Sequence, residues 1–326
     1  MDVTPPVSVV MPLLNEALHL ERAVDAIVGQ NYPGDLEIVL AVGPGHDDTL
    51  GVARRLAEKD DRIVVVENPS GRTPDALNLA TAAARHDIIV RVDGHGFLSR
   101  GYIARAVRAL EEHDAANVGG IMQAEGVTDF EKAVAVAMTS PLGVGGARFH
   151  TGGEAGPADT VYLGVFRSEW LRKAGGYDPR FTRAQDWELN YRIRRDGGLV
   201  WFDPELTVQY RPRGSFRALA KQYRDYGRWR RVVAKRHPGS INARYLAPPT
   251  AVLAIAGGLV GGFFWRPLWA IPAAYATAIG AGGVVIARGQ PWRVAIRVPG
   301  VLATMHCSWG WGFLTSQPNR LVPEED

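Results

Sequence analysis

Short apolar runs alternate with helical patterns along the first 210 residues of the chain. Runs rich in β-branched residues predict strands at 7–11, 37–42, 63–67 and 88–92. In the three intervals between these strands, the spacing of apolar residues predicts helices at 16–29, 49–57 and 74–84. This alternation is typical of a parallel sheet with helices on both faces. The expected fold class of this region is therefore α/β.

The loops after these strands are the expected ligand-binding region, because ligands of open parallel sheets bind at the carboxyl ends of the strands. We therefore expect the loops after Val10, Val42, Glu67 and Val92 to line one cleft. The first strand leads into P-L-L-N-E at residues 12–16, which contains no glycine. The G-x-G-x-x-G fingerprint of dinucleotide-binding proteins is missing there, which argues against a dehydrogenase.

A different pattern begins near residue 245. Three runs without a charged residue follow one another at 245–265, 267–287 and 298–319. Each is as long as a helix that crosses a bilayer, which needs about 20 residues. The first two are rich in Gly and Ala and meet at Arg266, which predicts a helical hairpin with a short turn. The third contains His306 and several glycines, so two outcomes stay open: it spans the membrane, or it lies at the interface.

The alternative for all three runs is a buried apolar helical bundle in a soluble protein.

Just before these three runs, apolar residues at helical spacing form a stripe: Phe216, Leu219, Tyr223, Tyr226, Trp229 and Val233. Arginines and lysines surround this stripe, which predicts a basic amphipathic helix lying on anionic lipid. The alternative is a helix packed in the protein core with one solvated face.

The distribution of charge supports three regions. Residues 1–210 carry 21 basic and 30 acidic residues, whereas residues 211–244 carry 11 basic and one acidic residue. We therefore expect a cytosolic domain at 1–210, a basic amphipathic interface segment at 211–244, and a membrane region with two to three transmembrane helices at 245–326. Basic residues approach the first run and separate the second from the third, so both segments are expected on the cytoplasmic side.

The ends of the chain and its cysteine content add little to this picture. The first residues show no signal-peptide pattern, so we expect the first domain in the cytosol and the protein in the cytoplasmic membrane as a multi-pass protein. Cys307 is the single cysteine, which excludes an intramolecular disulfide and a zinc site made of several cysteines.

Two carboxylate motifs carry the candidate chemistry. Asp93 and His95 follow the fourth predicted strand, and carboxylate oxygen and imidazole nitrogen can both bind a divalent ion. Asp186 falls at the start of a predicted helix, where the helix dipole favours its anion, as a general base requires. The structural alternatives are that Asp93 caps a turn, and that Asp186 is an N-cap while Glu188 pairs with Arg192.

Taken together, these residues resemble the family 2 glycosyltransferases, which have a GT-A fold. The resemblance is carried by P-L-L-N-E at 12–16, N-P-S-G-R-T-P-D-A-L-N at 68–78, R-V-D-G-H at 91–95, G-G-Y-D-P-R-F at 175–181 and Q-D-W-E-L-N at 185–190. In detail the set is most similar to the branch that contains the succinoglycan-type ExoA glycosyltransferases, and it covers nearly the whole chain.

The resemblance implies roles for individual residues. Pro12, Asn15 and Glu16 would contact the nucleoside, and Arg72 and Asn78 would lie near the base and the diphosphate. Gln185, Trp187 and Glu188 would belong to the donor site. Asp93 and His95 would hold Mg²⁺ or Mn²⁺ in place of the family's D-x-D motif, and Asp186 would be the catalytic base.

The implied activity is the inverting transfer of a sugar from a nucleoside diphosphate donor to a lipid-linked or glycan acceptor at the cytoplasmic face of the membrane. Donor, acceptor and membrane lipids are the expected partners, and nucleic acid is not. Two alternatives stay open: a polyprenyl-phosphate sugar synthase, and a non-catalytic membrane-anchored scaffold.

Two departures from the family pattern affect this interpretation. Val42 stands where many members have an aspartate that recognises uracil, so the sequence leaves the base of the donor open. The stretch 222–229 matches the Q-x-x-R-W motif of processive synthases only in part, because its spacing differs. With few expected spans as well, processive synthesis of a polymer is not expected.

Overall fold

The computed structural model of the chain describes residues 4–322, and these fall into two compact units. The first unit runs to Gln123 and resumes over Gly152–Tyr210. The second comprises Ala124–Thr151 and the chain from Arg211 onward. This division differs from the contiguous domain expected at 1–210, because residues 124–151 group with the C-terminal helices.

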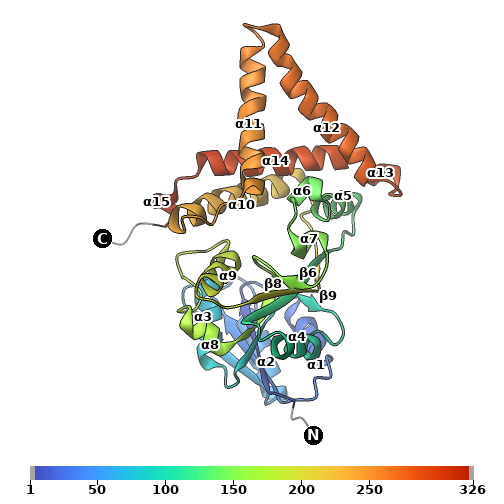
Figure 1. Cartoon of the computed structure of the whole chain (residues 1–326). Helices are drawn as coiled ribbons and strands as arrows, with labels where there is room; N and C mark the ends of the chain where they lie inside the picture. Colours follow the sequence, from blue (N-terminus) through green and yellow to red (C-terminus); the bar gives the residue numbers. More distant parts are fainter. Residues whose placement is uncertain (1–3, 323–326) are drawn as a thin grey trace. The chain divides into compact units, whose positions relative to one another are not determined.

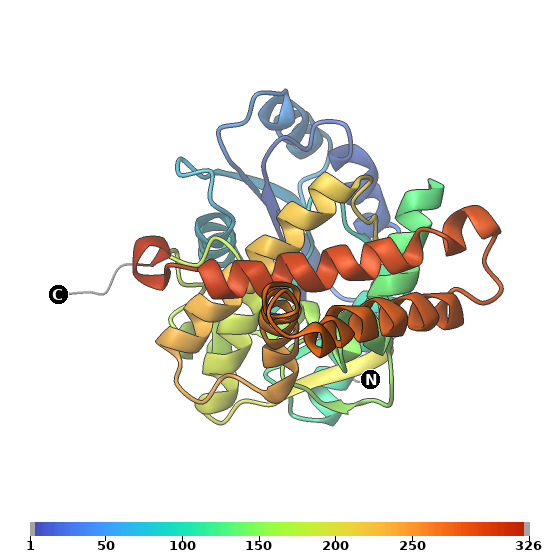
Figure 2. The same ribbon diagram turned by 90° about the horizontal axis from the view of Figure 1, so that it is seen from above.

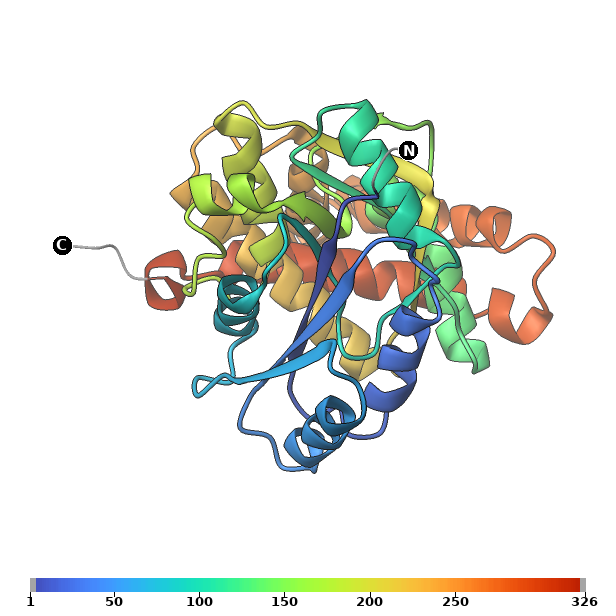
Figure 3. The same cartoon turned by 90° about the horizontal axis from the view of Figure 1, so that it is seen from below.

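The first unit is built on one sheet of nine strands. Their order is β3-β2-β1-β4-β8-β6-β9-β5, and β7 pairs with β9. The strands are β1 (Val7–Leu13), β2 (Leu36–Val42), β3 (Ile63–Glu67), β4 (Ile88–Arg91), β5 (Phe97–Leu98), β6 (Asn117–Ala124), β7 (Gly156–Pro157), β8 (Tyr162–Arg167) and β9 (Val200–Tyr210). Figure 3 shows β1, β2 and β3 side by side in blue and cyan.

The predicted parallel strands all form. Strands β1, β2, β3 and β4 pair in parallel, and Ile63–Glu67 has the predicted bounds. The sheet also contains antiparallel strands that the sequence did not predict, because β8 pairs antiparallel with both β4 and β6. A GT-A-like sheet of mixed direction results, in which only the N-terminal half has the parallel βαβ pattern.

Helices cover both faces of this sheet. They are α1 (Leu20–Val28), α2 (Thr49–Lys59), α3 (Thr73–Ala83), α4 (Tyr102–Glu112), α8 (Ser168–Lys173) and α9 (Gln185–Arg195). Successive residues of β1 enter different cores: Val9 packs with α1 and α4, and Val10 packs with α3, α8 and α9. This alternation is the period of two expected of a strand that is buried on both faces.

The first helix begins four residues later than the sequence predicts. Asn15 has a left-handed backbone conformation with φ 58°, and the next two backbone amides donate to side chains in the loop after β2 and at the start of α2. Glu16 donates to Thr49 Oγ1 at 2.8 Å and Ala17 donates to Asp47 Oδ2 at 3.0 Å. These bonds hold the segment in a turn, so regular helix starts only at Leu20.

The second unit is helical. It contains α5 (Asp129–Met138), α6 (Pro141–Val144), α7 (Arg148–Thr151), α10 (Phe216–Arg236), α11 (Ala243–Gly261), the 3₁₀ helix η1 (Arg266–Trp269), α12 (Ala270–Ile286), α13 (Trp292–Ala295), α14 (Val298–Thr315) and α15 (Pro318–Leu321). Helices α11 and α12 form the predicted hairpin, shown in orange in Figure 1. Two segments, Ala243–Gly261 and Arg266–Ile286, are long and apolar enough to cross a membrane.

The basic helix forms over the predicted residues, but most of its apolar stripe is not available to lipid. Leu219, Tyr223, Trp229 and Val233 are buried in the folded chain, and only Phe216 and Tyr226 are exposed. These burials fit the alternative of a core-packed helix with a solvated basic face.

Candidate functional site

The carboxyl ends of the parallel strands lie together, as expected for the ligand-binding edge of such a sheet. Gly94, after β4, is so close to the end of β1 that a Cβ atom there would lie 2.7 Å from Glu16 Cγ. A Cβ atom on Gly43, after β2, would lie 3.1 Å from the backbone of Gly71, after β3. The four predicted loops therefore meet at one edge of the sheet.

The two candidate catalytic carboxylates converge on one buried arginine. Arg91 ends β4, and its side chain is only 4% exposed. Its Nη2 donates to Asp93 Oδ1 at 3.1 Å, and its Nη1 donates to Asp186 Oδ1. Asp93 and Asp186 thus bind the same guanidinium group, although 93 residues of sequence separate them. The sequence singled out both aspartates but assigned no role to the arginine between them.

The electrostatics of this cluster keep Arg91 charged. Burial alone would lower its pKa, but the charge interactions and hydrogen bonds with Asp93 and Tyr177 together outweigh burial and hold the pKa above its ordinary value. The guanidinium also lies 5.8 Å from the centroid of the Tyr177 ring, within cation–π range. A permanent cation therefore lies between two carboxylates at the ligand-binding edge of the sheet.

Asp186 lies in the first turn of α9, where a helix dipole stabilises an anion. It is not the N-cap, because α9 begins at Gln185 and the capping position is Ala184 with φ 59°. The side chain of Asp186 is 27% exposed, so it is sheltered but reachable. These features suit a general base that must stay ionised and approach an acceptor hydroxyl.

The next residues of α9 are buried in the protein. The Glu188 carboxylate accepts hydrogen bonds from Arg192 Nε at 2.7 Å and from Arg192 Nη2 at 2.6 Å, and its side chain is 2% exposed. This is the i,i+4 ion pair expected from the structural alternative. Trp187 is buried and stacks on Tyr191, with ring centroids 5.5 Å apart. Gln185 is half-buried at the first position of the helix.

Glu16 and His95 form a second polar pair at the same edge. His95 Nδ1 lies 2.8 Å from Glu16 Oε1, and the side chain of Glu16 is 15% exposed. The neighbouring Asn15 accepts a hydrogen bond from the His46 amide at 2.7 Å, and Pro12 is half-buried in β1 opposite Ala41. The P-L-L-N-E motif therefore ties the ends of β1, β2 and β4 together.

These residues fit a divalent ion that a ligand helps to hold. A carboxylate on Nδ1 favours the tautomer whose lone pair is on Nε2, the arrangement typical of metal-binding histidines. Asp93 adds a carboxylate that is 25% exposed. Over residues 4–322, no group of three or more His, Cys, Asp or Glu side chains could hold a metal ion. Asp93 and His95 would thus need oxygens of the donor diphosphate to complete the coordination.

The predicted residues of the 68–78 loop make different contacts. Arg72 Nε binds Asp75 Oδ2 at 2.7 Å, and its side chain is 49% exposed, so it can reach a ligand. Asn78 Nδ2 donates to the Tyr177 carbonyl at 2.7 Å, and Asn78 Oδ1 accepts from the Tyr177 amide at 2.8 Å. Asn78 therefore positions the G-G-Y-D segment, beside the ring that contacts Arg91.

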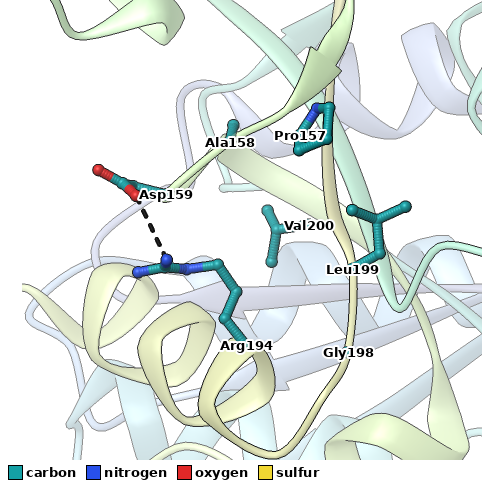
Figure 4. A pocket seen from close by; sticks show the side chains of 7 residues that line it. All are labelled: Pro157, Ala158, Asp159, Arg194, Gly198, Leu199 and Val200. Carbon is teal, nitrogen blue, oxygen red and sulfur yellow. Dashed lines mark ion pairs between the residues drawn. The ribbon is translucent and has the colours of Figure 1, made fainter.

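A surface hollow lies elsewhere on the first unit (Figure 4). It is lined by Pro157, Ala158, Asp159, Arg194, Gly198, Leu199 and Val200. Its charged residues, Asp159 and Arg194, are 3.3 Å apart and form an ion pair with each other. None of the predicted site residues lines this hollow, so it is not part of the candidate site.

Comparisons with known proteins agree on the family. The glycosyl transferase family 2 model matches residues 8–175. The succinoglycan biosynthesis protein ExoA of Rhizobium meliloti is 32% identical over 94% of this chain and 93% of its own length. The dolichyl N-acetyl-α-D-glucosaminyl phosphate 3-β-D-2,3-diacetamido-2,3-dideoxy-β-D-glucuronosyltransferase of Methanococcus voltae is 24% identical over 74% of this chain and 77% of its own length.

Solved structures share the fold. The mannosyltransferase PcManGT of Pyrobaculum calidifontis, in complex with GDP-Man and Mn²⁺, aligns with a TM-score of 0.60 at 22% identity. The alignment covers 95% of this chain and 90% of that one. TarS 1–349 of S. aureus, in complex with UDP-GlcNAc, aligns with a TM-score of 0.52 at 13% identity over 95% and 91% of the two chains.

Proposed function

Because the chain belongs to the glycosyl transferase family 2, close to the ExoA branch, we propose that it is an inverting glycosyltransferase. It transfers a sugar from a nucleoside diphosphate donor to a lipid-linked or glycan acceptor at the cytoplasmic face of the membrane. The observation that carries the proposal is the convergence of Asp93 and Asp186 on Arg91 at the active edge of the sheet.

In this reaction Asp186 removes the proton from the acceptor hydroxyl as that oxygen attacks the anomeric carbon. The carbon–oxygen bond to the diphosphate breaks on the opposite side, which inverts the configuration. When bound, Mg²⁺ or Mn²⁺ supplies charge neutralisation for the departing diphosphate, and Asp93 and His95 hold it. Arg91 keeps both carboxylates oriented. Arg72, which is half-exposed, contributes a cation near the base and the diphosphate.

Which nucleobase the donor carries is to be determined by experiment. Val42 replaces the uracil-binding aspartate of many relatives, and the two solved neighbours bind a guanosine and a uridine nucleotide. Sugar transfer should therefore be assayed with a panel of GDP, UDP, dTDP and ADP sugars, each with and without Mn²⁺.

The membrane assignment rests on the α11–α12 hairpin. Only about 11% of each apolar segment is buried within the protein, whereas a core helix of a soluble protein is mostly buried. Leu253, Val260, Val284 and Val285 are among their exposed side chains. Exposed apolar side chains on helices of bilayer length are typical of a membrane-facing surface. We therefore place the protein in the membrane with its first unit in the cytosol.

The decisive variant is Asp186→Asn, with Asp196→Asn as its matched control. Each substitution removes one ion pair with an arginine, but Asp186 lies in the first turn of α9, whereas Asp196 is its C-cap and pairs with Arg195. Loss of a general base should lower kcat about 100-fold or more. Equal activity of the two correctly folded variants would contradict the mechanism.

Two further outcomes separate the alternatives. A polyprenyl-phosphate sugar synthase uses an acceptor that is already ionised, so Asp186→Asn would keep its activity when polyprenyl phosphate is the acceptor. A scaffold would bind none of the nucleotide sugars in the presence of Mn²⁺, which calorimetry measures directly.

A further inference from the structure

The third apolar run forms α14, and this helix packs on the basic helix α10. A Cβ atom on Gly312 would lie 2.1 Å from the Arg224 carbonyl, and one on Gly227 would lie 2.0 Å from the Trp309 carbonyl. Glycine at both positions lets the two backbones touch. Figures 1 and 2 show α14, in red, lying across α10 at the base of the hairpin.

Side chains extend this contact to the end of the chain that the structure describes. Arg231 donates to the carbonyls of Phe313 and Leu314 at 3.1 and 2.9 Å. Ser316 donates to the Arg228 carbonyl at 2.9 Å, and Arg236 donates to the Val322 carbonyl at 2.6 Å. The two helices run in the same direction and are bonded where each ends.

This contact decides where α14 can lie. Helix α10 carries eight basic residues and one acidic residue over Phe216–Arg236. If α14 crossed the bilayer, part of that helix would enter the hydrocarbon with it, and buried arginines there are strongly disfavoured. The contact with α10 therefore keeps α14 out of a spanning orientation.

One face of α14 is nevertheless exposed and uncharged. Gly300, Cys307, Trp311 and Thr315 are exposed, at spacings of seven, four and four residues. The preceding turn adds Trp292 and Ile296, which are 71% and 68% exposed, at the same spacing. A stripe of this kind beside Arg288, Arg293 and Arg297 is typical of a helix at a lipid headgroup layer, where tryptophan and arginine are favoured.

We propose that the chain enters the bilayer only as the α11–α12 hairpin, and that α14 lies in the headgroup layer with this stripe against the lipid. The lipid leaflet is the partner of the stripe. The chain after α14, as far as Val322, then returns to the side from which α10 came. The first unit is expected on that side of the membrane as well, because the five residues that join β9 to α10 are too few to cross a bilayer. This inference rests on the membrane attachment in the proposed function and not on its chemistry.

The hairpin supports this geometry. At its tip, Phe263, Phe264 and Trp265 are 79%, 89% and 63% exposed, and Arg266 is the single charged residue there. Its base adjoins the basic residues of α10 and α13. An aromatic tip with little positive charge and a strongly basic base are expected of two crossings that start and finish on the cytosolic side.

Single-cysteine labelling of the full chain tests the topology. In a Cys307→Ser background we use Leu18→Cys in the first unit, Phe264→Cys at the hairpin tip and Gln317→Cys, at an exposed position just after α14 that is not part of the stripe. A membrane-impermeant maleimide is applied to sealed vesicles of both orientations. We expect Leu18→Cys and Gln317→Cys to react from one side and Phe264→Cys from the other. Reaction of Gln317→Cys from the side of Phe264→Cys overturns the inference, as does reaction of all three from one side.

Depth is measured at native Cys307 with an environment-sensitive fluorophore. Quenching by brominated lipid should exceed quenching by aqueous iodide at least twofold, and iodide quenching as strong as at Leu18→Cys overturns the placement in lipid. The same variants are assayed for sugar transfer. If the topology differs from the expected one but sugar transfer is intact, only this inference is contradicted. If the topology is as expected but the unmodified chain transfers no sugar, only the proposed function is contradicted.

Discussion

The guanidinium group of Arg91 and the carboxylate of Asp186 form an ion pair between residues 95 positions apart in the sequence. Because the same guanidinium also binds Asp93, it fixes the distance between the candidate base and the candidate metal ligand. Two carboxylates that approach one site without a cation would repel each other, and one would become protonated. Arg91 thus makes the arrangement of the two aspartates possible.

We predict that Arg91→Met destabilises the protein by about 3–5 kcal/mol, because it leaves two carboxylates, each only about a quarter exposed, close together without their shared cation. Arg91→Lys should keep the fold and lower kcat about 10-fold or more, since one ammonium cannot bind both aspartates in the same geometry. Urea unfolding and donor turnover measure the two effects.

The control for this prediction is Arg62→Met. Arg62 also pairs with an aspartate two residues away, at 2.6 Å, but its side chain is 47% exposed. An exposed pair contributes about 0–1 kcal/mol, so the loss of stability should stay within that range. An equal loss of stability in the two variants would show that the ion pairs of Arg91 contribute no more than an ordinary surface ion pair.

The candidate site illustrates what the sequence could predict. Asp93 and Asp186 were recognisable because each stands in a distinctive motif at the end of a predicted element. Arg91 was not, because its partners are defined by the pairing of β4 with its neighbours and by the approach of α9, which no local pattern encodes. A charged residue at the end of an apolar strand is the signal that would have identified it.

Glu37 makes stability depend on pH. It is 1% exposed and accepts hydrogen bonds from Ser8 Oγ at 2.5 Å and Arg85 Nε at 2.6 Å. Burial would raise its pKa, but the bonds to Ser8 and Arg85 outweigh burial and lower the pKa below 4.5. Its contribution is therefore fully present above the unfolded-state pKa and is lost as the pH falls through the folded-state pKa.

We predict that Glu37→Gln lowers the free energy of unfolding by about 1.5–3 kcal/mol at pH 7, the range for hydrogen bonds to a charged group. The difference from the unmodified chain should shrink as the pH falls below about 4. Urea unfolding at pH 7, 5 and 3.5 checks this. Glu67→Gln is the control, because Glu67 pairs with Arg54 while 64% exposed. A constant difference across the three pH values would contradict the assignment.

Two helix glycines of the second unit should respond in opposite ways to alanine. At Gly312 a Cβ atom would lie 2.1 Å from the Arg224 carbonyl, whereas at Gly280 nothing lies within 4 Å. Gly312→Ala should separate α10 from α14 and destabilise the protein by about 1–3 kcal/mol. Gly280→Ala should be neutral or stabilising by up to about 1 kcal/mol. Thermal unfolding in detergent measures both, and similar shifts would argue against the backbone contact.

The fold shows a similar division between local and distant information. The parallel strands and their helices were predictable, because each one has its own apolar run and period. The antiparallel strands β6, β8 and β9 were not, because their direction depends on long connections across the sheet. For α14, hydropathy alone could not distinguish a helix that crosses the membrane from one that lies in its plane. The distinction comes from the contact between α10 and α14, which depends on Gly227 and Gly312, 85 residues apart in the sequence.

Glu16 is predicted to control metal affinity through His95. The 2.8 Å contact between Glu16 Oε1 and His95 Nδ1 holds the tautomer and the orientation of the imidazole, so its loss should weaken metal binding about 10- to 100-fold. The Glu16→Gln variant should therefore need more Mn²⁺ for half-maximal activity, while kcat at saturating Mn²⁺ changes much less. Glu21→Gln, on the exposed surface of α1, is the control and should leave the Mn²⁺ curve unchanged. If Glu16→Gln instead raises only the KM for the donor and leaves the Mn²⁺ requirement alone, Glu16 contacts the nucleoside directly, as the family resemblance implies.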